Sequence, residues 1–253
     1  MSKTVIFVWT ANVNNVDTDV SFWGIGDAVR GIISLYQLSK LFGFKLIIDT
    51  QLTRISELLK SEKHEYSDYV LQNRDNIPFV YPGTVMDFIT SSESDVILLM
   101  TNDLYYDHIT DDCKDFVKKI LTPTDEFESC ILSDVPGIIH CRTGDKHLVY
   151  DGELDDDLYY QFIRNIKFKS DYLLMSDSVL FKQRIKQDFP SMRMLDTAIG
   201  HTGYKNHSHV LSDTLKEFLT ITRSKQIDSY SVYSWTSGFV KIAHDIYDVP
   251  LRT

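Results

Sequence analysis

The sequence has few cysteines and no long apolar run. Only Cys113, Cys130 and Cys141 occur among 253 residues, and no two of them form a CxxC pair. This odd, low count argues against a disulfide framework and is typical of a reducing compartment. The N-terminal apolar stretch "KTVIFVWT" is too short for a signal peptide, and no run approaches the roughly 20 residues of a membrane helix. We therefore expect a cytoplasmic protein of the producing or host cell, with no transmembrane segment.

The sequence is also short of positive charge. It has 26 Lys and Arg residues against 36 Asp and Glu residues, a formal net charge of −10. Nucleic-acid-binding domains usually carry a basic surface, so we expect no nucleic-acid partner. A local basic site for a phosphate group remains compatible with this balance. The 43% hydrophobic content and the length allow one large domain or two small ones.

Short apolar runs alternate with helical patterns along most of the chain. Near-continuous apolar runs are typical of parallel strands that are covered on both faces, and their alternation with helices predicts an α/β fold. The predicted strands are 4–10, 44–50, 95–100, 137–141, 171–176, 192–195 and 227–231. The predicted helices are the segment from Asp27 to Gly43, then 112–121, 155–168, 178–188, 212–224 and 237–247.

A domain boundary is predicted between 122 and 136, where "TPTDEFESC" is polar and Pro123 interrupts a helical pattern. We expect an N-terminal α/β domain over 1–128. A C-terminal α/β domain would cover 129–253. Two such halves would face each other across a cleft lined by the carboxyl ends of their strands, where ligands of open α/β sheets usually bind.

The stretch "GIIHCRTGD" runs from a buried strand directly into charge. Arg142 would stand at the carboxyl end of a central strand, and its guanidinium is suited to a diphosphate. Gly144 allows a sharp turn, and Asp145 is suited to hold the arginine or to cap a helix. A purely structural ion pair of Arg142 is an equally good interpretation of this motif alone.

Two further segments have the character of anion sites. "FWGIGDAVRGIISLY" is a glycine-rich turn that opens a helix, with Gly24 and Gly26, but it lacks the third glycine of GxGxxG and the GK[ST] ending of a phosphate loop. "DSYSVYSWTSGFVKIAHDIYDVPL" places hydroxyl side chains between a strand and a helix. Taken alone, the first segment is weak evidence and can be a tight strand-to-helix connection. The second, taken alone, is better interpreted as a serine-rich N-cap.

These motifs together resemble the fucosyltransferase-like glycosyltransferases. This superfamily, of GT-B type fold, includes bacterial α-1,6-fucosyltransferases, plant fucosyltransferases and protein O-fucosyltransferases. "GIGDAVRGIISLYQLSKLFGFKLIIDT", "FVKKILTPTDE", "IIHCRTGD", "SDSVLFKQRI", "GHTGY" and the C-terminal segment are similar to the family's motifs and follow the family's order. The short chain without an anchor points to the bacterial or large algal-virus members, where the donor sugar is not always fucose.

The resemblance implies roles for individual residues. Arg142 would bind the donor diphosphate, with His140 beside it, and Asp177 would contact the base or ribose. The remaining donor-pocket residues implied by the family motifs are His201, Ser234, Ser237, Gly238 and Phe239. The donor would be a nucleotide-diphosphate sugar, linked to guanosine or uridine, and the acceptor an oligosaccharide or glycoprotein glycan. The C-terminal domain over 129–253 would hold the donor, and the N-terminal domain over 1–128 would receive the acceptor.

No metal or cofactor is expected. The "DDD" at 155–157 lies at a predicted helix start, where acidic residues interact favourably with the helix dipole. The histidines of "HTGYKNHSH" have no cysteine pair or HExxH motif beside them to support a zinc site. A phosphoryl-transfer enzyme is disfavoured because the chain lacks a phosphate-loop lysine.

The favoured function is an inverting, metal-independent glycosyltransferase. Arg142 and helix N-termini would stabilise the leaving diphosphate, and a carboxylate would take the acceptor proton. Asp27 and Asp75 are the candidate general bases. Asp27 is slightly preferred because it lies in a matched motif, although a helix N-terminus weakens a carboxylate as a base. If neither acts as the base, Asp103 is the next candidate. Open alternatives are the same chemistry with a UDP-pentose, as in a xylosyltransferase, and a non-catalytic nucleotide-sugar- or glycan-binding protein.

Overall fold

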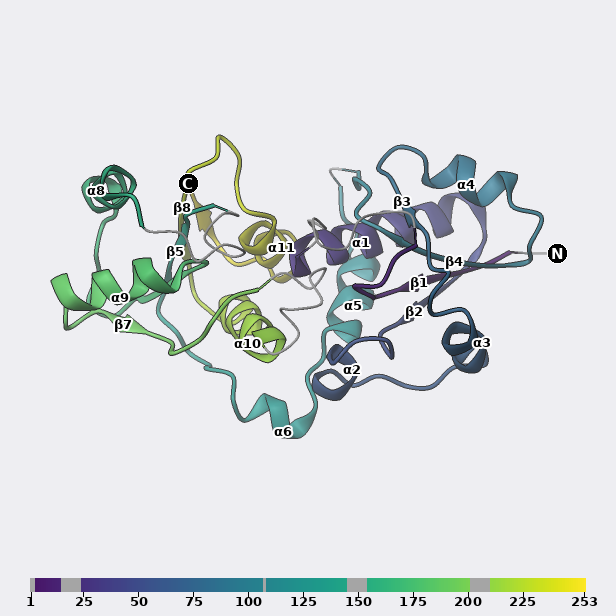
Figure 1. The fold of residues 1–253 in the computed structure, drawn as a ribbon, viewed down its shortest axis with the longest axis horizontal. Coiled ribbons are helices and arrows are strands. Elements are labelled where there is room, and N and C mark those ends of the chain that lie inside the picture. The colour runs from purple at the N-terminus through teal and green to yellow at the C-terminus, as the bar shows by residue number, and fades with distance from the viewer. Residues whose placement is uncertain (1–2, 15–23, 107, 145–153, 201–209) are drawn as a thin grey trace. The chain divides into compact units, whose positions relative to one another are not determined.

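The computed structural model describes residues 3–14, 24–106, 108–144, 154–200 and 210–253, and these divide into two compact units (Figure 1). Unit 1 contains the described residues up to Glu128, and unit 2 those from Ser129 onward. Each unit contains its own parallel β-sheet flanked by helices. The α/β class predicted from the alternating pattern is confirmed.

Unit 1 contains a four-stranded parallel sheet in the order β2-β1-β4-β3. Its strands are β1 (Thr4–Val8), β2 (Lys45–Asp49), β3 (Phe79–Val80) and β4 (Val96–Thr101). Three of them coincide with predicted strands. The fourth, β3, has only two residues, which is too short for an apolar pattern to reveal.

The principal helices of unit 1 are α1 (Ile25–Phe42) and α5 (Asp111–Ile120), which pack against each other. Helix α1 ends at Gly43, which adopts a left-handed conformation with φ 73°. Short helices complete the unit where no helix was predicted: α2 (Ile55–Leu58), α3 (Ser67–Gln72), α4 (Val85–Ser91) and α6 (Asp125–Glu128).

Helix α1 approaches the sheet unusually closely at one glycine. A Cβ atom on Gly31 would lie 2.0 Å from the carbonyl oxygen of Thr101 at the end of β4. Only a residue without a side chain allows the helix backbone to lie against the strand at this point. This contact fixes α1 against the carboxyl end of the first sheet.

Unit 2 contains a five-stranded parallel sheet in the order β7-β6-β5-β8-β9. Its strands are β5 (Ile138–Arg142), β6 (Leu173–Ser176), β7 (Arg193–Met194), β8 (Ile227–Ser231) and β9 (Leu251–Arg252). The first four are at predicted positions. The two-residue edge strand β9 was not predicted, for the same reason as β3.

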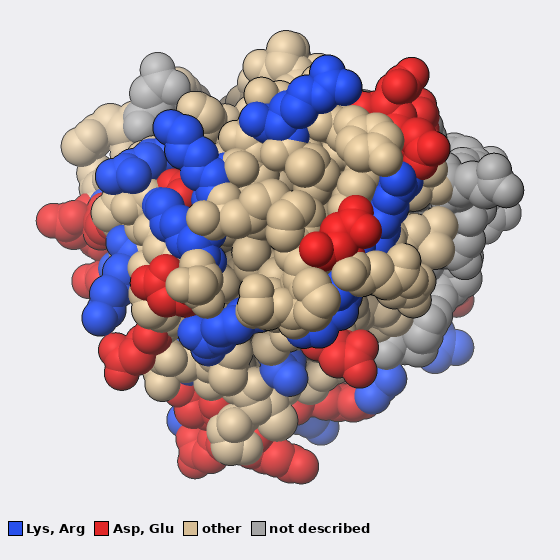
Figure 2. Space-filling view, turned by 90° about the vertical axis from the view of Figure 1, so that its left-hand side faces the viewer, with Lys and Arg blue, Asp and Glu red and all other residues tan. Residues whose placement is uncertain are grey.

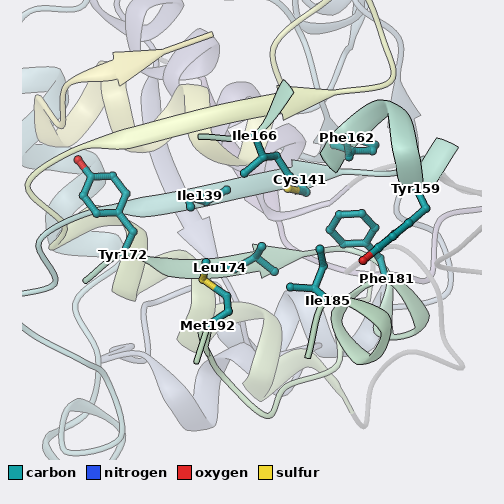
Figure 3. Close-up of a cluster of buried hydrophobic side chains, with 10 residues drawn as sticks. All are labelled: Ile139, Cys141, Tyr159, Phe162, Ile166, Tyr172, Leu174, Phe181, Ile185 and Met192. Carbon is teal, nitrogen blue, oxygen red and sulfur yellow. The ribbon is translucent and has the colours of Figure 1, made fainter. Parts of the chain in front are cut away.

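Helices cover both faces of this second sheet, as the apolar strands require. One face is packed by α8 (Asp156–Asn165) and α9 (Val179–Asp188), and the other by α10 (Leu211–Thr222) and α11 (Gly238–Tyr247). Figure 3 shows the first of these cores, in which Ile139 and Cys141 of β5 meet Phe162 of α8 and Phe181 of α9. The sheet is therefore the middle of a three-layer unit.

The register of the central strands brings their carboxyl ends to one edge. Cys141 of β5 is level with Ser176 of β6, and Arg142 is level with Ser231 of β8. Polar residues that follow these three strands consequently meet at the same place. This edge is where the charged end of "GIIHCRTGD" is located.

The surface of unit 2 mixes both signs of charge. Figure 2 shows the face that carries α8 and α9, where basic side chains are interspersed with acidic ones. Arg184 of α9, for example, is ion-paired with Asp156 of α8. No described helix of the chain is long and apolar enough to cross a membrane.

Candidate functional site

An ion pair joins the ends of β5 and β6. Arg142 Nη1 donates to Asp177 Oδ2 at 2.7 Å, and the side chains of Arg142 and Asp177 are 15% and 3% exposed. The pair is the structural contact that the alternative interpretation of "HCRTGD" expected. A guanidinium held in this way is also pre-oriented, because its carboxylate partner fixes the plane of the fork. The pair therefore does not exclude phosphate binding by Arg142.

Asp177 also shapes the loop that follows β5. Its carboxylate accepts hydrogen bonds from Thr143 N and Thr143 Oγ1, each at 2.7 Å, and from Gly144 N at 3.1 Å. Gly144 adopts φ 116°, a conformation that side-chain-bearing residues rarely reach. The family resemblance implied that Asp177 contacts the nucleotide base or ribose; in the structure its oxygens accept hydrogen bonds from the protein. It stays a predicted donor contact.

His140 is buried in β5, two residues before Arg142 at the carboxyl end of that strand. Its ring stacks on Phe239 of α11 at 6.2 Å between centroids, and its Nδ1 atom has no hydrogen-bond partner among the described residues. Burial lowers the pKa of His140 to about 4. The imidazole is therefore neutral near pH 7, and Nδ1 is a buried polar atom that no described residue hydrogen-bonds.

The N-terminus of α11 lies beyond the end of β8. Ser237 is the N-cap and makes no side-chain capping bond, and Gly238 begins the helix. Val232 N donates to Arg142 O at 3.1 Å, so the segment after β8 remains beside β5. Ser234 lies exposed in this segment. The backbone N–H groups and dipole of a helix start suit an anion.

The glycine loop belongs to unit 1. Gly24 is the N-cap of α1 and Gly26 lies within its first turn. Gly24 N donates to Asp27 Oδ2 at 3.1 Å, while Arg30 Nη2 lies 3.1 Å from Asp27 Oδ1. Asp27 is thus a helix-capping acid with a basic neighbour, the role that was weighed against its action as a base.

The other two candidate bases have different surroundings. Asp75 has a side chain that is 74% exposed and accepts from Asn12 Nδ2 at 3.0 Å. Asp103 is buried and accepts from Gly83 N at 2.8 Å and from Ser34 Oγ at 3.1 Å. Asp75 is accessible to a substrate, whereas Asp103 is a structural acceptor that ties α1 to the loop after β3.

Sequence reasoning missed a buried charge network in unit 2. Lys182 of α9 lies 3.4 Å from Glu217 of α10, and both contact Thr197 in the segment after β7. Burial raises the pKa of Glu217 to about 7, although Lys182 opposes this. The network anchors the segment that leads to the "GHTGY" motif. No sequence signal identifies it, since its residues are far apart in the chain.

A His–Asp contact in unit 1 was missed as well. His64 Nε2 lies 2.8 Å from Asp49 Oδ2 at the end of β2, and Tyr66 N donates to His64 Nδ1 at 3.2 Å. Both ring nitrogens are occupied, and Gln51 donates to the same carboxylate. The pair therefore stabilises the connection after β2, and the geometry gives it no free base for catalysis.

The acidic triplet at 155–157 begins α8, as expected. Asp155 is the N-cap and accepts from Asp157 N at 2.9 Å, and Asp156 is paired with Arg184. Within the described ranges, no three His, Cys, Asp or Glu side chains cluster as metal ligands. Asp145, His201 and the other histidines of "HTGYKNHSH" lie outside the described residues.

Comparison with known proteins decides the fold. No protein-family model and no curated protein matches the chain. Among solved structures, NodZ α-1,6-fucosyltransferase of Bradyrhizobium, co-crystallised with GDP, matches with a TM-score of 0.54 at 14% identity, over 96% of this chain and 92% of NodZ. The chain has the NodZ fold.

Two further structures support the same result. NodZ soaked with GDP-fucose matches with a TM-score of 0.53 at 13% identity, over 97% of this chain and 93% of NodZ. Arabidopsis thaliana FUT1 in complex with GDP matches with a TM-score of 0.53 at 11% identity, over 99% of this chain and 70% of FUT1. The GT-B-like fold of the resemblance is confirmed. Identities this low establish the fold alone, so the activity rests on the chain's own residues.

Proposed function

We propose that the chain is an inverting, metal-independent glycosyltransferase that moves a sugar from a nucleotide-diphosphate sugar to a glycan hydroxyl. The observation that carries this proposal is the position of Arg142. It lies at the carboxyl end of the central strand β5, oriented by Asp177, in a chain with the NodZ fold. NodZ was co-crystallised with GDP and soaked with GDP-fucose, which supports a nucleotide sugar as donor here.

Arg142 and the start of α11 provide the positive potential that such a reaction needs. When the bond between the sugar and the diphosphate breaks, negative charge develops on the leaving oxygen. The guanidinium and the N–H groups from Gly238 onward would stabilise this charge in place of a metal ion. Asp177 keeps the guanidinium in position, because its second oxygen is already held by Thr143.

The acceptor hydroxyl must lose a proton as it attacks the sugar from the side opposite the diphosphate. Asp75 has the more accessible carboxylate, and Asp27 is engaged as a capping acid. Accessibility therefore favours Asp75 over Asp27, whereas the family motif favours Asp27. Turnover of Asp27→Asn and Asp75→Asn at saturating substrates discriminates between them, since loss of the base costs about 100-fold or more.

The identity of the donor is a separate question. Fucose is the sugar implied by resemblance, and a UDP-pentose fits the same diphosphate contacts. The competing function is a non-catalytic nucleotide-sugar- or glycan-binding protein. A thermal-shift panel of GDP- and UDP-linked sugars tests the proposal, because a ligand that binds the native state alone raises the melting temperature. We expect one nucleotide sugar to do so, and no shift with any of them would overturn the proposal.

A further inference from the structure

Unit 2 contains a cavity of about 320 Å³ between α8 and the segment that follows β8. This volume is near the lower end of the roughly 300–1,000 Å³ that is usual for small-molecule sites. Gln161 and Asn165 of α8 line one wall, and Tyr230, Tyr233 and Trp235 line the other. None of the described residues that line it has a charged side chain. This described lining is therefore suited to a neutral ligand and not to a diphosphate.

The lining combines two kinds of group. Amide and hydroxyl side chains both donate and accept hydrogen bonds, as the hydroxyl groups of a sugar require. The rings of Tyr233 and Trp235 are stacked with their centroids 4.6 Å apart and an angle of 9° between their planes. Trp235 is nonetheless 63% exposed. Tyr233 covers one face of the indole, and the other face provides an apolar platform for the C–H face of a sugar ring.

The walls of the cavity are held by hydrogen bonds. Lys167 N, in the segment that follows α8, donates to the hydroxyl of Tyr230 at 3.2 Å. Asn165 Nδ2 donates to Gln161 O at 2.9 Å, and Tyr233 N donates to Ser231 Oγ at 3.1 Å. A cavity that is formed before binding loses less entropy when a ligand enters. The site is therefore preorganised.

The cavity also borders the loop that carries Arg142. A Cβ atom placed on Gly144 would lie 3.5 Å from the hydroxyl of Tyr233, so the rim of the cavity adjoins the turn after β5. We propose that this cavity binds a neutral sugar unit of the acceptor glycan, beside the site of the leaving diphosphate. The inference rests on the proposed function, and it places a contact for the acceptor on unit 2.

The test uses an array of neutral oligosaccharides probed with the fluorescently labelled protein. The variants are Trp235→Ala, which removes the platform, and Gln161→Ala, which removes an amide. Tyr160→Ala is the matched control, because Tyr160 is an exposed aromatic residue of α8 that does not line the cavity. We expect the parent and the control to bind the same oligosaccharides, and the two cavity variants to bind them at least tenfold more weakly.

Three results would overturn the inference. These are an array with no binding, equal binding by Trp235→Ala and the parent, or displacement of the glycan by guanosine or uridine, which would assign the cavity to the donor nucleoside. The thermal shift produced by nucleotide sugars is measured on the same variants. Glycan binding without any thermal shift by a nucleotide sugar would refute the transferase function and leave the cavity assignment standing. A thermal shift by a nucleotide sugar without any glycan binding would refute the cavity assignment and leave the transferase function standing.

Discussion

At the scale of single residues, the account depends most on Arg142. Lysine at this position would retain the positive charge beside Asp177 but lose the planar fork that contacts two oxygens at once. We predict that Arg142→Lys folds with a melting temperature close to that of the parent and loses about 100-fold or more in turnover, the usual cost of removing one donor to a developing negative charge. Steady-state release of nucleoside diphosphate measures this loss.

A matched substitution separates the expected loss of turnover in Arg142→Lys from a general effect of replacing an arginine by lysine. Arg54 forms an exposed pair with Glu57 in unit 1, so Arg54→Lys changes the same atoms at a site without a proposed role. It should leave turnover unchanged. If Arg142→Lys retains near-parental turnover at saturating donor, then the arginine is only the structural partner of Asp177, and its donor role is wrong.

The lowered pKa of buried His140 leads us to predict that the stability of the protein depends on pH. This pKa is about 4 in the folded protein, lowered by burial from 6.5, so the unfolded chain binds a proton first as the pH falls. The stability contributed by the neutral ring is present above pH 6.5 and is lost as the pH falls toward 4, by about 3 kcal/mol. His140→Gln should lack this loss. Urea unfolding between pH 7 and 4 measures it, and parallel curves for parent and variant would contradict it.

The candidate site was only partly predictable at this scale. Arg142 was identified because a charge directly after an apolar run is visible in the sequence, and Asp177 was identified only through the family resemblance. Their pairing was not, since it depends on the register between β5 and β6. The Lys182–Glu217 and Asp49–His64 contacts left no pattern at all. Pairings between distant residues arise from packing, which one sequence does not display.

At the scale of elements, the long strands and helices were predictable and most of the short ones were not. The two-residue strand β7 is the exception, because it lies within the predicted strand 192–195. Strand β5 and helix α1 contain enough apolar residues to show a period. The two-residue strands β3 and β9 are defined by pairing with a neighbour, and α2 and α6 have only four residues each. Elements of this size are stabilised by tertiary context and carry little propensity of their own.

The contact between α1 and β4 gives a prediction for one element. Alanine favours a helix over glycine by up to about 1 kcal/mol, yet a Cβ on Gly31 would collide with the Thr101 carbonyl. Overpacking of this kind costs about 3 kcal/mol, so the collision should win and Gly31→Ala should destabilise the protein. Gly24→Ala has open space around its Cβ and should cost less than about 1 kcal/mol. Equal unfolding midpoints for the two variants would show that the helix shifts freely.

At the scale of the whole molecule, the account predicts activity without a metal ion. Arg142 and the start of α11 supply the positive charge, and the acidic triplet that begins α8 is engaged in capping and in a pair with Arg184. Turnover should therefore be unchanged within a few-fold in excess EDTA. Loss of activity in EDTA that manganese or magnesium restores would refute this and return attention to the triplet.

The central claim is that the chain transfers a sugar with inversion from a nucleotide diphosphate. Time-resolved proton NMR of the protein, the nucleotide sugar that gives the largest thermal shift, and a mixture of acceptor glycans tests it most directly. The account predicts that the anomeric signal of the donor disappears while nucleoside diphosphate and a glycoside, or free sugar, of the opposite anomeric configuration appear. An intact donor after prolonged incubation, cleavage between the two phosphates, or a product of retained configuration would contradict it.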